Sequence, residues 1–269
     1  MRGIADYEFL RPIGAGGNGL LFLARRPQRL SGESDVVAVK VFARESTSDM
    51  FRHAAARLRG CAAVRSPYLI PLYDVGLHDG IFYYAMEYLV GGSLAQPAQP
   101  VDAALQVRAV GDAARALAAL HRAGIVHGAV KPGNVLLDPY GAKLSDPDLN
   151  HVVAPGLRYS GYASTEGMAF ADPAALLGEP PTAEHDVWSI GVLVHWVATG
   201  SHGHDDVAQN GVAALRQLVS ARPRLSPTLA DPLRDVVRDC LAESALRPSS
   251  SDVADRIAAI AADMTAAAT

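Results

Sequence analysis

The stretch HGAVKPGNVLL, residues 127–137, decides the fold of this chain. Its polar residues His127, Lys131 and Asn134 stand among glycines and a proline, which indicate a loop. Other motifs lie on both sides of this stretch, and their order and spacing along the chain decide how it is interpreted. In chain order these motifs are residues 13–21, 37–40, 84–89, 91–94, 146–148, 172–174, 186–191 and 247–248.

In this order and spacing, the motifs resemble those of protein kinases, in particular the bacterial, actinobacterial-type serine/threonine kinases. Residues 127–134 are similar to the catalytic-loop pattern H-R-D-L-K-P-x-N. Residues 13–21 are similar to the glycine-rich loop G-x-G-x-x-G-x-V, and residues 37–40 to the V-A-I-K strand. Residues 146–148 stand where the family has D-F-G, and residues 172–174 where it has A-P-E. The resemblance covers nearly the whole chain.

This resemblance implies an α+β fold with two lobes, a small β-rich lobe with one main helix and a larger helical lobe. We expect a single kinase-like domain over residues 1–269, since a chain of this length fits one such domain. The small lobe is expected at 1–89, the hinge at 87–90 and the large lobe at 91–269.

Local sequence patterns agree with this division. Runs rich in β-branched and aromatic residues predict strands at 7–13, 20–25, 35–42, 70–75 and 81–88, with a turn at 76–80. Helical spacing predicts helices at 48–58, 101–123, 187–199, 212–222, 232–242 and 251–264. The strands thus precede residue 90, and most of the helices follow it.

Composition narrows the class of protein. With 49% hydrophobic residues the chain can bury a large core, and its net charge of −4 gives no reason to expect nucleic acid as a partner. Cys61 and Cys240 are too few for a disulfide framework and are expected to be reduced core thiols. The start of the chain leaves no room for a signal peptide, and no apolar run reaches the ~18–20 residues of a membrane helix. We expect a cytoplasmic protein, unless the chain is one domain of a longer one.

The resemblance implies a site for ATP or ADP with magnesium. Asn134 and Asp146 are expected to bind the magnesium ion, because a hard cation prefers oxygen donors. Lys40 is expected to meet the α- and β-phosphates, and Glu87 and Leu89 to act through backbone groups. The residues expected to surround the adenine ring are Leu21, Ala38, Met86 and Leu136. The full set of nucleotide-binding residues that the resemblance implies is Gly14, Gly16, Gly19, Leu21, Ala38, Lys40, Met86, Glu87, Leu89, Lys131 and Leu136.

Two groups that the family uses for catalysis are missing. Ala129 occupies the position of the aspartate that accepts the proton of the substrate hydroxyl, so no catalytic residue is assigned. No Asp or Glu occurs at 50–73, so Lys40 lacks the helix glutamate with which the family pairs it. Glu45 and Asp49 lie only at the entrance of that helix.

Further departures fall around the activation segment. Pro147 fixes φ and removes an N–H, and Asp148 replaces a glycine, so we expect the flip of this motif to be restricted. Asp148 is either a relocated metal ligand or a solvated carboxylate. Ala174 replaces the glutamate of A-P-E, so Arg247 has either found another acid or moved to water. Gly167 stands where serine/threonine kinases place a threonine.

We therefore expect a pseudokinase, a kinase-like domain that binds ATP and magnesium and acts as a regulatory or scaffold module. Its expected partners are proteins, such as an active kinase or a phospho-binding domain. One alternative is a weakly active serine/threonine protein kinase with displaced catalytic groups. A second alternative is a small-molecule phosphotransferase, because His127-Gly128 is similar to the H-G-D of antibiotic kinases.

Weaker signals remain open. Residues 201–206 are either a metal site, through His202 and His204, or a polar loop. The basic residues of the small-lobe helix form either a solvated face or a docking surface for an acidic partner, and they are Arg52, His53, Arg57 and Arg59. In the activation segment, Ser160, Ser164 and Thr165 are either phosphate acceptors for another kinase or ordinary residues of a flexible segment.

Overall fold

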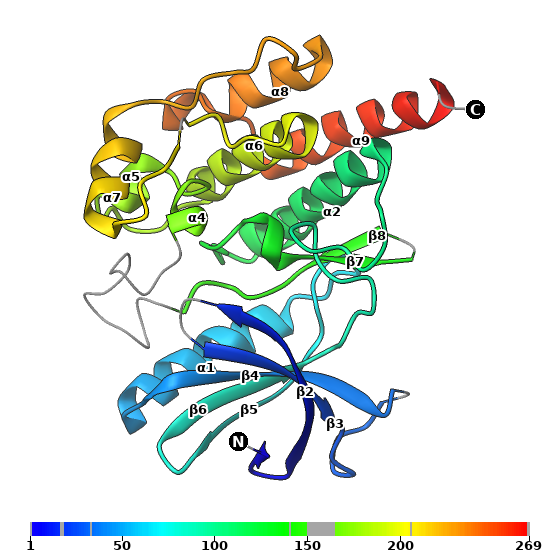
Figure 1. Ribbon diagram of the computed structural model, residues 1–269, viewed down its shortest axis with the longest axis vertical. Helices are drawn as coiled ribbons and strands as arrows, with labels where there is room; N and C mark the ends of the chain where they lie inside the picture. The colour runs from blue at the N-terminus through cyan, green and yellow to red at the C-terminus, as the bar shows by residue number, and fades with distance from the viewer. Residues whose placement is uncertain are drawn as a thin grey trace. The chain divides into compact units, whose positions relative to one another are not determined.

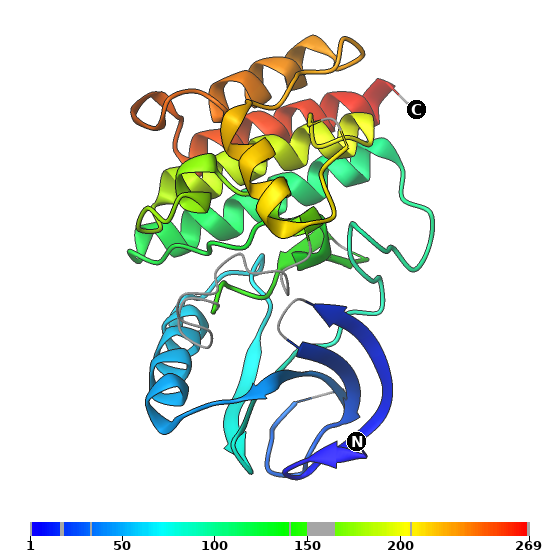
Figure 2. The same cartoon turned by 60° about the vertical axis from the view of Figure 1, so that its left-hand side comes forward.

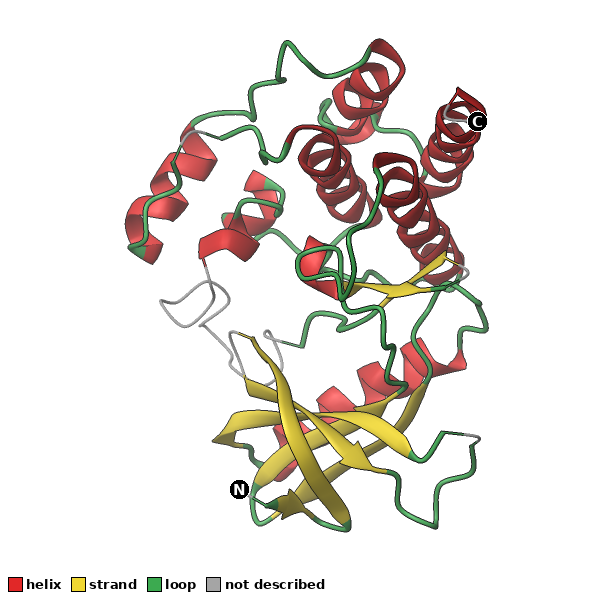
Figure 3. Cartoon of the chain, turned by 45° about the vertical axis from the view of Figure 1, so that its right-hand side comes forward, coloured by secondary structure: helices red, strands yellow, loops and turns green. Residues whose placement is uncertain are grey.

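A six-stranded antiparallel sheet forms most of the N-terminal part of the chain, and helices follow it (Figures 1 and 3). The computed structural model describes residues 2–16, 19–32, 34–139, 141–149, 165–204 and 206–267. The chain divides into two compact units. The first unit holds Met1–Ala63 and Ile70–Tyr88, and the second holds Val64–Leu69, Leu89–Asp148 and Thr165–Thr269.

The sheet of the first unit has the strand order β1-β2-β3-β4-β6-β5. Its strands are β1 Gly3–Ile4, β2 Tyr7–Gly16, β3 Gly19–Arg25, β4 Val36–Glu45, β5 Leu72–His78 and β6 Ile81–Met86. Side chains alternate between the two faces of each strand. One face forms a hydrophobic core around Val37, Val39 and Val41 of β4.

Helix α1, Ser48–Ala63, packs on the other face of this sheet. The ring of Phe51 lies 6.0 Å from that of Phe82 on β6, and the ring of Phe82 lies 4.7 Å from that of Phe42 on β4. The buried residues of α1 are Ala54, Ala55, Leu58 and Cys61. Aromatic and aliphatic packing therefore holds α1 on the sheet.

The expected turn at 76–80 is wrong for its first three residues. Strand β5 continues to His78, and only Asp79 and Gly80 form the turn, each with positive φ (48° and 76°). An Asp-Gly pair suits a two-residue hairpin because both positions need left-handed backbone. Gly76 pairs with Tyr83 in the strand, and a Cβ at Gly76 would lie 2.3 Å from the Tyr83 hydroxyl oxygen. Gly76 therefore makes room for the Tyr83 ring and does not end strand β5.

The second unit is mainly helical. Its helices are α2 Ala103–Arg122, α4 Thr165–Met168, α5 Pro173–Leu176, α6 Ala183–Thr199, α7 Gly211–Ser220, α8 Asp231–Cys240 and α9 Ser250–Ala267. Short 3-10 turns lie at Pro132–Asn134 (η1) and Ser244–Leu246 (η2), and a hairpin of β7, Val135–Asp138, and β8, Gly141–Leu144, completes the unit. The expected α+β fold class is confirmed.

The five longer helices predicted for this part of the chain are present, with shifted ends. Helix α6 begins before its predicted start at 187, because Thr182 and His185 form a capping box at its N-terminus. Helix α9 continues to Ala267, and in the first unit α1 continues beyond 58 to Ala63. The hairpin of β7 and β8 was not predicted.

Close helix packing builds the core of the second unit, and α9 runs beside α2 in Figure 2. A Cβ at Gly111 on α2 would lie 3.1 Å from Ile257 of α9. A Cβ at Gly191 on α6 would lie only 2.5 Å from Cβ of Cys240 on α8. Glycine at these positions thus permits the close approach of the helices.

None of the helices in the described part of the chain is both long and apolar enough to cross a membrane.

Both cysteines should be inert toward thiol reagents in the folded protein. Burial raises the pKa of the Cys240 thiol to about 12 and also raises the pKa of the Cys61 thiol, so little reactive thiolate exists at pH 8. An aromatic disulfide reagent should label neither residue in native buffer and both in denaturant. Rapid labelling of the native chain would contradict the packing described here.

Candidate functional site

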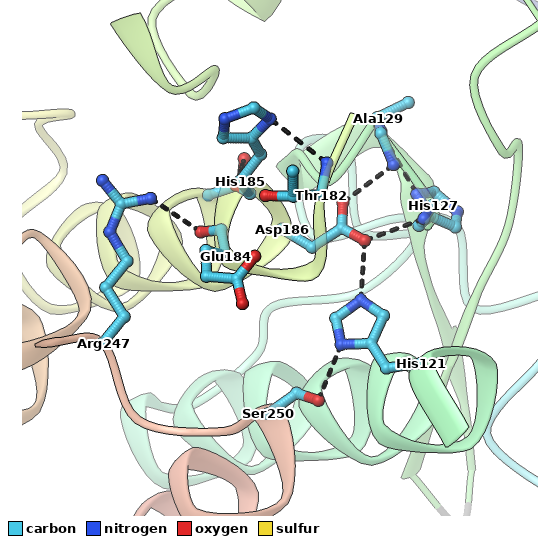
Figure 4. A network of polar contacts seen from close by, with 11 residues as sticks. His121, His127, Ala129, Thr182, Glu184, His185, Asp186, Arg247 and Ser250 are labelled. Carbon is cyan, nitrogen blue, oxygen red and sulfur yellow. Dashed lines mark hydrogen bonds and ion pairs between the residues drawn. The ribbon is translucent and has the colours of Figure 1, made fainter. Parts of the chain in front are cut away.

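A buried carboxylate, Asp186 in the first turn of α6, holds the loop that starts at His127 (Figure 4). Its Oδ2 accepts the backbone N–H of His127 at 2.7 Å, and its Oδ1 accepts that of Gly128 at 2.8 Å. His121 Nε2 at the end of α2 lies 2.9 Å from Oδ2, and His121 Nδ1 lies 3.0 Å from Ser250 Oγ at the start of α9. One network thus ties α2, α6 and α9 to the loop.

The segment after β8 is fastened to this loop by hydrogen bonds on each side. His127 Nε2 lies 3.1 Å from the Ser145 carbonyl oxygen, and the Asp148 N–H donates to the His127 carbonyl at 2.8 Å. Ser145 donates to the Asn134 carbonyl through both its N–H (2.9 Å) and its hydroxyl (3.1 Å). These hydrogen bonds therefore join the two segments into one assembly.

Asn134 and Asp146, the expected metal ligands, meet in this assembly. Asn134 Nδ2 donates to the carbonyl of Ala129 at 2.7 Å and to that of Asp146 at 3.4 Å. The amide nitrogen is thereby directed into the loop, which leaves the side-chain oxygen to face elsewhere. An amide oxygen and a carboxylate are donors that suit magnesium, so the residues present fit this ion.

A second buried carboxylate supports the strand that leads to Asp146. Asp112 of α2 accepts the N–H of Ala142 in β8 and a bond from Arg115, both at 3.1 Å. Burial raises the pKa of the Asp112 carboxyl above its ordinary value. A Cβ at residue 141 would lie only 2.6 Å from the Asp112 carboxylate and would clash with it, so the contact requires glycine at this position.

In the first unit, four of the expected nucleotide-binding residues share one face of the sheet. Leu21 of β3 pairs with Lys40 of β4, and Ala38 of β4 pairs with Met86 of β6. Because alternate residues face the same side, Ala38 and Lys40 lie on the face that also carries α1. Lys40 Nζ lies 6.0 Å from the centre of the Phe42 ring, at the limit of a cation–π contact.

Helix α1 supplies no carboxylate beyond its first turn. Its acid Asp49 forms an exposed ion pair with Arg52 three residues later. The part of α1 that packs on the sheet, from Ala54 to Cys61, holds alanine, arginine, leucine, glycine and cysteine. The missing helix glutamate noted in the sequence is therefore not replaced from within this helix.

The glycines near the end of β2 and at the start of β3 have different reasons to be glycine. A Cβ at Gly19 would lie 2.1 Å from the Val41 carbonyl oxygen, so strand pairing alone requires glycine there. Within the part of the chain that the structure describes, a Cβ at Gly14 would meet only the Leu21 side chain, at an ordinary 3.7 Å. The fold thus does not require Gly14. Gly16 pairs with Gly19, and Gly17 and Asn18 lie outside the described residues.

The remaining expected nucleotide-binding residues are divided between the units. The Glu87 N–H donates to the Pro71 carbonyl at 3.0 Å in the first unit. Leu89, Lys131 and Leu136 belong to the second unit, where Lys131 immediately precedes η1 and Leu136 bridges to Ser93.

Arg247 has found another acid, which is one of the two outcomes that the sequence left open. It forms a buried ion pair with Asp172, with both side chains about 5% exposed. It also donates to the carbonyls of Glu184 (2.8 Å, Figure 4) and Ala242 (3.0 Å), and it lies 5.0 Å from the centre of the Trp188 ring. Sequence reasoning missed Asp172, although an aspartate directly before a helix-starting proline indicates a cap.

Asp172 therefore serves two purposes at the start of α5. One carboxylate oxygen accepts the Ala174 N–H at 2.8 Å, and the other faces Arg247. The acid has moved from position 174, where the kinase pattern places it, to position 172. The arginine keeps a counter-ion even though the A-P-E glutamate is absent.

The weaker signals receive little support. His202 accepts the N–H of His204 at 3.3 Å through Nδ1 and lies with its ring near Phe170. Among the described residues there is no group of three or more His, Cys, Asp or Glu that could hold a metal ion. Asp205, Ser160 and Ser164 lie outside the described residues, and Thr165 begins α4.

Removing Asp172 should destabilise the folded protein by about 3–5 kcal/mol, because Arg247 would remain buried without its partner. Asp172→Ala should lower the denaturant midpoint, and adding Ala174→Glu should recover part of the loss. Asp231→Ala is the matched control, because Asp231 is 95% exposed in its pair with Arg234. The assignment fails if both single variants lose the same stability.

Comparison with known proteins agrees with this arrangement. The pattern of the protein kinase domain family matches residues 7–256. The serine/threonine-protein kinase PkaA of Streptomyces coelicolor is 29% identical over an alignment that covers 96% of this chain and 50% of PkaA. The corresponding values for PknJ of Mycobacterium tuberculosis are 30%, 84% and 39%, and for AfsK of S. coelicolor 29%, 96% and 32%.

The chain thus spans half or less of the length of these curated relatives. Its matched region contains strands β2 to β6 of the sheet, the loop at 127–134 and the ion pair of Arg247. The chain belongs to the protein kinase domain family and is similar to bacterial serine/threonine kinases.

Proposed function

We propose that residues 1–269 form a pseudokinase domain that binds ATP or ADP with magnesium and acts as a regulatory or scaffold module in signalling. The observation that carries the proposal is the loop at 127–134. Its frame is intact, because Asn134 still bonds the backbone of residue 129, yet that residue is Ala129 and offers only a methyl group. The frame for a nucleotide is kept while the proton acceptor is lost.

Nucleotide binding is supported first by Gly14. Because the fold has room for a side chain there, a need for close approach by a phosphate explains the glycine better than packing does. Lys40 supplies a cation on the same face of the sheet as Leu21, Ala38 and Met86. In this proposal the apolar residues bind the adenine ring and the ammonium group binds the phosphates.

Metal binding is supported by Asn134 and Asp146, whose positions the same hydrogen bonds fix. Magnesium held there would neutralise phosphate charge. The two residues would hold the ion, and Ser145 donates a hydrogen bond to the backbone of Asn134. This part of the proposal uses only groups that do not take or give a proton.

Weak phosphoryl transfer follows from the groups that are absent. A positioned general base contributes about 10²–10⁴-fold to a rate, and phosphoryl transfer also depends on the alignment of the phosphates. Here residue 129 offers no base, and α1 offers Lys40 no carboxylate after its first turn. Both losses lower the rate, although such effects are not additive.

A weakly active serine/threonine kinase is the second candidate, favoured by the names of the relatives and by the retained Lys40 and Asp146. The same relatives favour the protein-kinase branch over a small-molecule phosphotransferase. As a regulatory module, the domain would bind a protein partner, such as an active kinase or a phospho-binding domain, in the cytoplasm.

We expect ATP to bind in a magnesium-dependent manner in a calorimetric titration. Lys40→Met and Asp146→Asn should each weaken binding about 10–100-fold, because each removes a charge-assisted contact of ~1.5–3 kcal/mol. Arg59→Met and Asp263→Asn are controls at exposed positions of α1 and α9 and should leave the affinity unchanged. Absence of both heat and thermal shift at millimolar ATP would rule out the nucleotide site.

Restoring the base alone should not restore catalysis. We expect Ala129→Asp to transfer phosphate to itself and to generic protein substrates near background, as the unmodified chain does. Recovery should also need a glutamate within residues 50–58 and a Phe-Gly pair at 147–148, because a base acts only on aligned reactants. Lys40→Met variants serve as the blank in a radiolabel assay.

Two results would contradict this expectation. Label incorporation by the unmodified chain that disappears with Lys40→Met would favour the active-kinase candidate. Turnover of about 1–100 s⁻¹ by Ala129→Asp alone, the ordinary kinase range, would show that the other losses are unimportant.

A further inference from the structure

Asp146 adopts a backbone conformation that needs support. Its φ is +57°, and among the described residues the other non-glycine positions with positive φ, Ala5 and Asp79, lie in turns. Asp146 also precedes Pro147, and a residue before proline favours extended backbone. Such conformations persist at functional sites only where the surroundings impose them.

The surroundings do impose it, from both ends of the segment. Ser145 is bonded to Asn134 through its N–H and hydroxyl, and Asp148 is bonded to His127 through its N–H. Pro147 between them is buried and has no N–H to satisfy. The expected metal ligand is thus held between two fixed residues.

Gly128 and Asp148 lie close to each other. Gly128 has φ +75°, and its N–H is held by Asp186. A Cβ at Gly128 would lie 3.1 Å from Cβ of Asp148 and 3.8 Å from its Oδ2. A side chain at residue 128 would therefore crowd the Asp148 side chain from its first carbon onward.

The two residues also depart from the kinase patterns in a reciprocal way. The pattern H-R-D places a long side chain at 128, and the pattern D-F-G places a glycine at 148. In this chain the glycine stands at 128 and the side chain at 148. Because residue 128 has no side chain, the side chain of Asp148 has room beside it.

We propose that Gly128 and Asp148 are a matched pair of positioning residues that keeps Asp146 in a single conformation for binding the metal–nucleotide complex. The proposal rests on the proposed function, because Asp146 acts there as a metal ligand. The pair fixes the metal ligand before nucleotide arrives, so the segment at 145–148 does not gate binding. It also explains why a side chain restored at position 128 alone would meet the side chain of Asp148.

A double-mutant cycle of Gly128→Ala, Asp148→Gly and both changes together tests the pair. The backbone strain of alanine at positive φ is present in both backgrounds and cancels in the cycle, which leaves the contact. Gly124→Ala is the matched control, because Gly124 has φ +72° and a Cβ there would have no neighbour within 4 Å.

The first readout is amide hydrogen exchange of Asp148 in the nucleotide-free chain. We expect Gly128→Ala to speed this exchange about tenfold or more, because the added methyl group disturbs the packing against Asp148. In the Asp148→Gly background, Gly128→Ala should have little effect on the exchange at residue 148. Gly124→Ala should leave it unchanged. Equal effects of Gly128→Ala in both backgrounds would overturn the proposal.

The second readout separates positioning from plain stability. Gly128→Ala should weaken ATP binding in magnesium about tenfold but metal-free ATP binding by less than about twofold, with recovery in the double variant. A loss that is equal with and without magnesium would overturn the metal-positioning role. If the unmodified chain binds no nucleotide, the proposed function fails, and the hydrogen-exchange cycle still decides whether the pair exists.

Discussion

The carboxylate of Asp186 is the interaction on which the arrangement of the second unit depends. It is 1% exposed and receives backbone N–H groups from His127 and Gly128 in addition to the contact with His121. A buried carboxylate is costly unless it is fully hydrogen-bonded, so the loop must approach α6 closely. Because two of the donors are backbone groups, the bonds do not depend on the side chain at 128 and would survive its replacement. The loop can therefore lose catalytic side chains without losing its shape.

The second unit keeps buried charges paired and side chains packed at positions where the sequence departs from the kinase pattern. Arg247 remains buried, and Asp172 supplies the charge that Ala174 does not. Gly128 lacks a side chain, and the Cβ of Asp148 lies 3.1 Å from where a Cβ of residue 128 would stand. These substitutions preserve packing and charge around a site whose proton acceptor is missing. Under the proposed function, this pattern belongs to a domain that is maintained for binding, with chemistry reduced or absent.

Much of the fold could be predicted from the sequence, because local signals and long-range constraints agreed. Residues 36–45 are rich in β-branched residues and form β4, and the helical spacing near 101–123 became α2. The glycine at 76 misled the turn prediction, because the ring of Tyr83 on the next strand explains it. The end of α1 was underestimated, since its last turn contains no capping or breaking signal other than Gly60.

The site was less predictable, and the reason is contact between distant residues. Lys40, Asn134 and Asp146 were assigned roles from motifs, whereas Asp172 was not recognised as the partner of Arg247, which lies 75 positions away. His121 and Ser250 were missed in the same way, since they meet across 129 positions. Local spacing predicts which residues share a strand or helix face. It does not predict which charge a buried arginine will find in a folded core.

Native mass spectrometry of the chain after incubation with magnesium and ATP reports bound nucleotide and covalent phosphate in one spectrum. We expect one intact ATP with magnesium on each chain and no phosphate attached to the protein. A chain that carries covalent phosphate while ATP is converted to ADP would show that the domain is an active kinase. A chain that carries no nucleotide at all would show that the proposed nucleotide site is wrong.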